Sequence, residues 1–335
     1  MKWYVADFNG VLTDLQKKLA GHLATPKDAD VWVVWQDCQG SYKDLIQTAK
    51  KLGVSKPTYV VQHGRRATYD YGPPNSFEFN ADKYLCWGTN DYNNMVKLGY
   101  GNRTHVVGCP LNSLIKPKVV HKEKVVLFVP VNTGKEEPEN IAVYYELLKL
   151  RYHKAQKAVL HSKDVLKDKW GFNNKINVTF NELAQGFDVI AKLLPWHDKS
   201  LYHGSVLTGY QDQRKNNELV FELLQNVDLV VGIDEGCTEI YAYGHDVPVI
   251  IVDGFQYRQH RGGQYVVDDI YRTKAALHVP ISDLGMAIDY TFAHPEHLRK
   301  ERSEVAEAEM GLSYRNATDN IIKLVRKDFA SLTSR

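Results

Sequence analysis

The sequence predicts an α/β protein with two similar halves, each built on a parallel β-sheet. The first observation is a series of short runs that are apolar almost throughout: Val31–Trp35, Tyr59–Val61, Tyr84–Trp87, His105–Val107, Val125–Val129, Val189–Ala191, Leu229–Val231 and Val249–Val252. Unbroken apolar runs are typical of strands covered by helices on both faces. The second observation is that helix-period segments alternate with these runs, which favours α/β architecture. The third is a single interruption of the alternation, near residues 115–124.

The helical segments are recognised by their apolar spacing. In Glu139–Tyr152, the residues Ile141, Tyr145, Leu148 and Tyr152 fall near one helix face. The other candidates are Leu15–Ala24, Tyr42–Leu52 and Asn217–Asn226, and the stretch from about Pro295 to Ala330 is helical and charged. We therefore expect helices between the strands and a helical C-terminal segment.

The interruption at residues 115–124 is basic, contains Pro117 and shows no clear period, and a buried strand restarts directly after it. We interpret it as the linker between the halves. The predicted organisation is a domain over residues 1–117, a domain over 118–300, and a helical segment over 301–335 that can pack back on the first domain. A cleft is expected between the two sheets.

Composition places the chain among globular proteins. Of 335 residues, 44% are hydrophobic and 24% charged, and the formal net charge of +2 does not favour a surface that coats nucleic acid or membrane. The four cysteines form no CxxC pair, which argues against a zinc site and a disulfide framework. No signal peptide or apolar run of about 18 residues is visible. We expect a cytoplasmic protein.

Loops that follow strands are the places where an open α/β sheet binds ligands. In the first half, Asp7, Asn9 and Gly10 follow the opening strand, and this segment can equally be an ordinary turn. The segment Gln62-His63-Gly64-Arg65 ends another strand, and Gln62, Gly64 and Arg65 are expected, like Asp7, Asn9 and Gly10, to line the acceptor side of the cleft. A histidine there is suited to accept a proton from an incoming hydroxyl, although a lone histidine is often structural.

In the second half, a strand ends in a loop of small residues, and a helix is expected to start at about Thr238. Gly236 and Cys237 complete this loop, which suits an anion such as a nucleotide phosphate. Glu239, in the first turn, can reach a ribose hydroxyl or serve as a capping partner. The earlier His197 can donate to a diphosphate or lie on the surface of a packed corner.

The segment after Val252 is rich in arginine and glycine. Arg258, Arg261 and Gly262 can hold a phosphate or a diphosphate leaving group, and the alternative is a solvated basic loop.

These motifs together resemble the CDP-glycerol glycerophosphotransferases and capsule-type polysaccharide transferases, which have the GT-B fold. The matching segments are a helix, a strand with its loop, a second strand and an Asp-x-x-x-Tyr-x-x-x-Arg-Gly pattern: Asn217–Asp228, Leu229–Glu239, Pro248–Val252, and Asp253, Tyr257, Arg261 and Gly262. His63-Gly64 and His197 look like the two histidines that such enzymes carry. The resemblance covers most of the second half and one motif of the first, and it implies a GT-B fold of two Rossmann-like domains.

The chain departs from that pattern at Glu235-Gly236-Cys237, where the family usually has serines, and between Gly244 and Pro248, which is longer than usual. Val231 also stands where a glutamate partner of Glu239 would be in many retaining enzymes. The resemblance therefore implies an inverting transfer, in which His63 deprotonates an acceptor hydroxyl.

The donor implied by the resemblance is a UDP-sugar or a CDP-polyol used as substrate, with no bound cofactor or metal. The only Asp-x-Asp match, Asp28-Ala29-Asp30, precedes a strand, where a metal–nucleotide site is not expected. The acceptor would be a polysaccharide, lipid-linked or other hydroxyl, and a lipid-linked acceptor would imply peripheral membrane contact.

Four alternatives to sugar transfer onto such an acceptor stay open. They are a glycerophosphotransferase, an isomerase like UDP-N-acetylglucosamine 2-epimerase, a phage-type glycosyltransferase acting on a DNA base, and a non-catalytic nucleotide-binding module. The near-neutral charge counts against DNA as a partner. The sequence does not indicate an oligomeric state.

Overall fold

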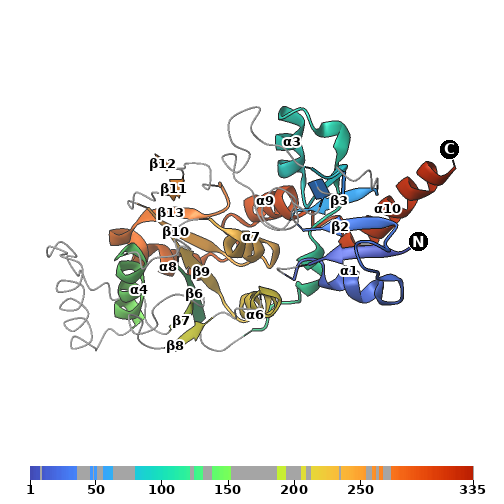
Figure 1. The fold of residues 1–335 in the computed structure, drawn as a ribbon. Helices are drawn as coiled ribbons and strands as arrows, with labels where there is room; N and C mark the ends of the chain where they lie inside the picture. The colour runs from blue at the N-terminus through green and yellow to red at the C-terminus, as the bar shows by residue number, and fades with distance from the viewer. Residues whose placement is uncertain are drawn as a thin grey trace. The chain divides into compact units, whose positions relative to one another are not determined.

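The computed structural model describes residues 1–7, 10–35, 46–47, 49–50, 56–62, 80–120, 124–130, 138–151, 187–193, 205–208, 213–233, 235–253, 259–261, 264–266 and 273–334. The chain forms two compact units. The first contains Met1–Lys116, Asp212–Glu218 and Glu304–Arg335, and the second contains Pro117–Gln211 and Leu219–Ser303. Figure 1 traces the elements of each unit.

The first unit is built on a five-stranded sheet in the order β1-β2-β3-β4-β5. Its strands are β1 (Trp3–Ala6), β2 (Val31–Val34), β3 (Thr58–Val61), β4 (Lys83–Cys86) and β5 (Thr104–Val106). All four pairings are parallel. The apolar runs of the first half therefore form the strands that the sequence predicted.

Both faces of this sheet are covered. Trp32 and Val34 of β2 belong to one buried cluster, and Val31 and Val33, which point the other way, are also fully or almost fully buried. In the described part of this unit, the helices include α1 (Thr13–Lys18), α3 (Thr89–Lys97) and α10 (Ala317–Thr333), with the end of α9 (Arg299–Met310). The continuous apolar pattern is explained by burial on both faces.

The C-terminal residues are part of the first unit's framework. The Cys109 amide donates to the Met310 carbonyl at 2.8 Å, and the Asn320 side chain donates to the Val107 carbonyl at 3.1 Å. A Cβ on Gly88 would lie 2.1 Å from the Ala308 carbonyl oxygen, so only glycine permits this approach. The C-terminal segment thus completes the unit that the N-terminus begins.

The second unit is built on a six-stranded sheet in the order β13-β10-β9-β6-β7-β8, and its pairings are all parallel. Its strands are β6 (Lys124–Val129), β7 (Phe187–Leu193), β8 (Ser205–Thr208), β9 (Leu229–Gly232), β10 (Val249–Asp253) and β13 (Leu277–Pro280). The strands β11 (Gln259–Arg261) and β12 (Gln264–Val266) form a separate antiparallel pair. This pair lies in the connection from β10 to β13.

Helices flank both faces of the second sheet (Figure 1). The helices α4 (Pro138–Arg151) and α8 (Leu284–Ala293) pack on alternate residues of β6, β7, β9 and β10 in one cluster. The helices α6 (Gln213–Gln225) and α7 (Cys237–Gly244) meet through Phe221 and Tyr241, whose ring centroids are 4.8 Å apart. The sheet is therefore the middle layer of three.

Some sequence expectations differ from the structure. In place of the helix expected over Leu15–Ala24, the structure has the shorter α1 followed by a 3-10 turn at Ala20–His22. This turn contains Gly21, and glycine is a poor helix former. Most of the helix expected over Tyr42–Leu52 lies outside the described residues. The sequence did not predict β8, β13 or the β11–β12 pair. The domain boundaries predicted from the sequence remain a prediction, and the unit bounds given above are a separate description of the structure.

In the part of the chain that the structure describes, no helix combines the length and the apolar character needed to cross a membrane.

Candidate functional site

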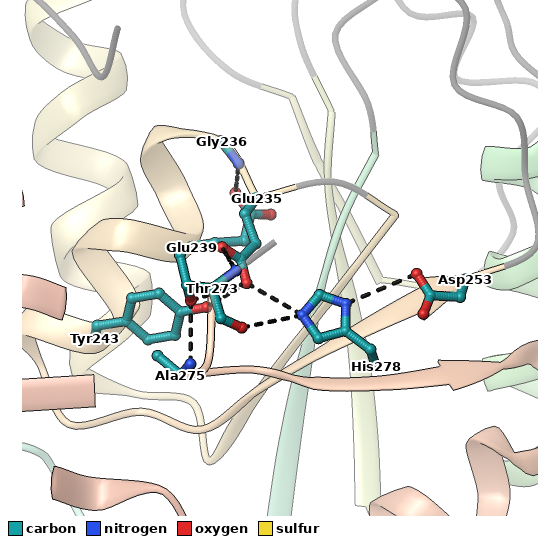
Figure 2. A network of polar contacts seen from close by, with 8 residues as sticks. All are labelled: Glu235, Gly236, Glu239, Tyr243, Asp253, Thr273, Ala275 and His278. Carbon is teal, nitrogen blue, oxygen red and sulfur yellow. Dashed lines mark hydrogen bonds and ion pairs between the residues drawn. The ribbon is translucent and has the colours of Figure 1, made fainter. Parts of the chain in front are cut away.

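The candidate site lies at the carboxyl ends of β9 and β10 in the second sheet, beside the neighbouring strand β13. Strands β9, β10 and β13 are adjacent and parallel, so their ends meet at the same edge, where open α/β sheets bind ligands. Glu235 follows β9, Asp253 is the last residue of β10, and His278 lies in β13. Figure 2 shows that their side chains converge.

The start of α7 is capped by its own first turn. The Gly236 amide donates to Glu239 Oε2 at 2.9 Å, and Glu239 is 2% exposed. Gly236 has no side chain to return a bond, so half of a capping box is formed. The Glu239 carboxylate thus offsets the positive end of the helix dipole. This is the capping role considered from the sequence, while a ribose contact by Glu239 stays a prediction.

Glu235 is fully buried and accepts hydrogen bonds from two partners. Its Oε1 accepts from the Tyr243 hydroxyl at 3.0 Å and from Thr273 Oγ1 at 3.1 Å, and its Oε2 accepts from the Thr273 amide at 3.0 Å. These donors satisfy a carboxylate that would otherwise be costly to bury. Glu235 therefore fastens α7 to the residue that leads into β13.

Tyr243 stays a donor in this network. Burial raises the pKa of its hydroxyl far above the ordinary value, and the neighbouring Glu235 raises the pKa further. The hydroxyl is therefore protonated at any physiological pH and can continue to donate to the carboxylate. The Thr273 hydroxyl also accepts from the Ala275 amide at 3.1 Å, so it is used twice.

His278 lies between two carboxylates. Its Nε2 is 3.2 Å from the Thr273 carbonyl oxygen and 3.6 Å from Glu235 Oε1, and its Nδ1 is 3.7 Å from Asp253 Oδ1 (Figure 2). A carbonyl only accepts, so Nε2 carries a hydrogen. The neighbouring Glu235 carboxylate raises the pKa of His278, burial lowers it, and the net shift is upward. The site therefore favours the imidazolium form.

Four predicted site residues of the second half come together at this edge: Gly236, Cys237, Thr238 and Glu239. Arg261 lies in β11, of which only the backbone is described. His197, Arg258 and Gly262 lie outside the described residues.

In the first unit, Asp7, Gly10 and Gln62 are described, and His63, Asn9, Gly64 and Arg65 are not. Gly10 has a φ of 79°, which agrees with the tight turn expected there. Asp7 Oδ2 accepts from the Thr13 hydroxyl at 3.1 Å. Gln62 is 1% exposed, and its side-chain oxygen accepts from the Trp87 amide at 2.7 Å. It joins the ends of β3 and β4, and its contact with an acceptor stays a prediction.

A cavity of about 770 Å³ lies elsewhere in the first unit. Its lining comes from residues at or just before the starts of β2, β3 and β4, and from the end of α10. The charged residues of the lining include Asp30, Lys56, Asp82, Lys83 and Asp328. Lys83 pairs with Asp328 at 2.7 Å. These are the amino ends of the strands, where an open sheet does not usually bind its ligand.

Three residues of the network, Tyr243, Thr273 and His278, were missed by sequence reasoning. They belong to no motif, and the strand that carries His278 was not predicted. A usable signal was Glu235 itself, because a glutamate in a loop of small residues needs donors when it is buried. Among the described residues, no group of three His, Cys, Asp or Glu side chains is arranged to hold a metal ion.

Comparisons with known proteins give a likeness of fold. No family model matches the sequence, and no curated protein matches it either. A structure of the wall teichoic acid polymerase TagF, in a variant soaked with CDPG, matches over 100% of this chain and 90% of its own length, with a TM-score of 0.57 and 11% identity. The fold is of the GT-B type.

A second likeness agrees with that fold. The UDP-GlcNAc 2-epimerase from Neisseria meningitidis, bound to UDP-GlcNAc, matches over 95% of this chain and 80% of its own length. The TM-score is 0.51 and the identity 15%. The α/β fold with two Rossmann-like units, predicted from the sequence, is confirmed.

Proposed function

We propose that the chain transfers a group from a nucleotide-activated donor to an acceptor hydroxyl. The observation that carries the proposal is the GT-B-type fold, with a loop and helix start at the carboxyl end of β9 in the second unit. Proteins of similar fold were studied with CDPG or with UDP-GlcNAc. We place the donor nucleotide at the edge formed by β9, β10 and β13.

The charge at this edge indicates what the donor site requires. Glu235 and Glu239 bring two carboxylates close to the start of α7, and Glu239 already caps that helix. The helix dipole is therefore not sufficient to bind a diphosphate here. Cations must compensate, and Arg258, Arg261 and His197 are the side chains we propose for this role.

The proposed chemistry is an inverting displacement. His63 removes the proton of the acceptor hydroxyl, which attacks the anomeric carbon of a nucleotide sugar. The departing nucleotide is stabilised by the arginines and by the first turn of α7, at Thr238. The proposal includes no metal and no bound cofactor, and it places the reaction in the cytoplasm.

A glycerophosphate group in place of the sugar is the second candidate, favoured by the fold likeness to TagF over the whole chain. The attack would then be at the β-phosphorus of a CDP-polyol, with the same roles for the side chains. A third candidate is epimerisation of a nucleotide sugar, favoured by the likeness to the 2-epimerase.

Thermal unfolding with UDP, CDP, GDP, UDP-GlcNAc and CDP-glycerol tests the donor site. A ligand that binds only the folded state stabilises it by about 2.7 kcal/mol at a hundredfold excess over its Kd. Products then separate the candidates. A transferase releases nucleotide only when an acceptor is present, and an epimerase releases none from a stable donor. If no nucleotide shifts the transition, the proposal is wrong.

Replacement of the proposed base is the sharper test. We expect His63→Ala to lower kcat about 10²- to 10⁴-fold, the range of general-base catalysis, without changing the Kd of the nucleotide. The exposed His22, in the same unit, provides the matched control His22→Ala. Equal activities of the two variants would remove His63 from the mechanism.

A further inference from the structure

The connection from β10 to β13 carries the arginines proposed for the donor diphosphate. It leaves the sheet after Asp253 and returns at Thr273, and the β11–β12 pair lies between them. Arg258, Arg261 and Gly262 all belong to this connection. The way its two ends are fixed therefore affects the geometry of the proposed donor site.

One imidazole contacts both ends of the connection. His278 Nδ1 lies 3.7 Å from Asp253 Oδ1 at the outgoing end, and Nε2 lies 3.2 Å from the Thr273 carbonyl at the returning end. Glu235 strengthens the returning end, because it accepts from both the amide and the hydroxyl of Thr273. Figure 2 shows His278 between Asp253 on one side and Thr273 with Glu235 on the other.

The charges around His278 come from each neighbouring element. Asp253 ends β10, Glu235 follows β9, and α7 contributes Glu239 and the protonated Tyr243 beyond Glu235. Lys274, next to Thr273, is exposed. Among the described residues, the charged groups within 4 Å of the imidazole are thus two carboxylates. The imidazolium can attract both ends of the connection, whereas a neutral ring attracts Asp253 much less.

We propose that His278 is a positioning residue, which in its imidazolium form holds the two ends of the β10–β13 connection together and thereby orders the donor site. The part that concerns the donor rests on the proposed function. The contacts of His278 with Asp253 and Thr273, which we call the clamp, do not depend on the proposed function, because they are present in the protein without ligand.

Amide hydrogen exchange of the ligand-free protein tests the clamp. The reporters are the Thr273 amide and the ladder amides of β11 and β12, with rates corrected for the intrinsic effect of pH. In the wild type we expect their protection to fall as the pH rises through the pKa of His278. In His278→Gln, which can still donate to the Thr273 carbonyl but carries no charge, we expect about tenfold lower protection and no pH dependence.

His294→Gln is the matched control, because His294 lies in the same unit, is 53% exposed and pairs only weakly with Glu296 at 3.8 Å. Asp253→Asn is a second, milder variant that removes one carboxylate and keeps the size of the side chain. It should lower the pKa of His278 in an NMR titration and move the loss of protection to lower pH. Protection in His278→Gln equal to that of the control at every pH would overturn the clamp.

Nucleotide affinity tests whether the clamp orders the donor site. We expect His278→Gln to weaken the binding of UDP or CDP about tenfold at pH 6, with a smaller loss at pH 8, as a displaced binding group would. If the wild type binds neither nucleotide, the proposed function fails, and the exchange experiment still decides the clamp. If nucleotide binds the variant and the wild type equally, the link between His278 and the donor site is wrong.

Discussion

His245 and His278 lie in the same unit but in opposite electrostatic environments. His245 ends α7, is 8% exposed and packs against Phe221 with a ring distance of 5.4 Å. Neither of its ring nitrogens has a hydrogen-bond partner among the described residues. His278 is partly exposed and lies between the carboxylates of Glu235 and Asp253. The comparison shows that neighbours, and not burial alone, decide the charge of a histidine.

The two histidines respond to pH with opposite signs. Burial lowers the pKa of His245 to about 4, below that of the unfolded chain, so its contribution to stability is lost as the pH falls from about 6.5. The neighbouring Glu235 carboxylate raises the pKa of His278. Its contribution is therefore complete below the unfolded pKa and is lost as the pH rises through the folded value.

The largest loss of stability is expected from removing the Glu235 carboxylate, which contacts His278, Tyr243 and Thr273. Glu235→Ala leaves the Tyr243 hydroxyl and the Thr273 amide without their acceptor, and we expect a loss of about 3 kcal/mol in the free energy of unfolding. Urea unfolding at pH 7 measures it. The control is Glu296→Ala, whose side chain is 63% exposed. A loss no greater than that of the control would show that the network contributes little.

An effect of at most the same size, and confined to acid pH, is expected from His245→Phe, which replaces a ring that cannot accept a proton without cost. The wild type should lose up to about 3 kcal/mol of stability between pH 6.5 and 4 through this residue, and the variant should lack this part of the decline. The measurement is the Tm as a function of pH, with His294→Phe as the control. Parallel pH curves for the variant and the wild type would mean that His245 is protonated without penalty.

The smallest effect on stability is expected from His278→Gln, about 1 kcal/mol or less, as for other partly exposed ion pairs. The loss should be present at pH 6 and should shrink as the pH rises, opposite in sign to the effect at His245. Urea unfolding at pH 6 and pH 8 checks it. A loss that grows with pH would mean that the neutral imidazole is the form that stabilises the fold.

The fold could be predicted from the sequence where apolar residues are continuous. The strands β2, β3, β6, β9 and β10 are such runs, because both faces of each sheet are covered. The strand β13 was missed because Leu277-His278-Val279-Pro280 carries a histidine and a proline. Its place in the sheet is set by its pairing with β10, which is a tertiary contact that no local pattern encodes.

The candidate site was predicted in its location and only partly in its residues. A helix start at about Thr238 was expected, and α7 begins one residue earlier, at Cys237; a capping role for Glu239 was one of two alternatives. Glu235 was noticed only as a departure from the serines of similar enzymes. Its partners Tyr243, Thr273 and His278 are brought to it by helix and strand packing over as many as 43 positions, so adjacency in the sequence gives no hint of them.

The framework role of residues 304–335 has a consequence for synthesis on the ribosome. The first sheet is translated before the second unit, yet Met310, Ile321 and Val325 of its unit's core are translated after it. The first sheet must therefore wait for helices α9 and α10, and by then the second unit has been translated. Translation thus favours completion of the second unit before the first, and early termination would leave the apolar face of the first sheet exposed to aggregation.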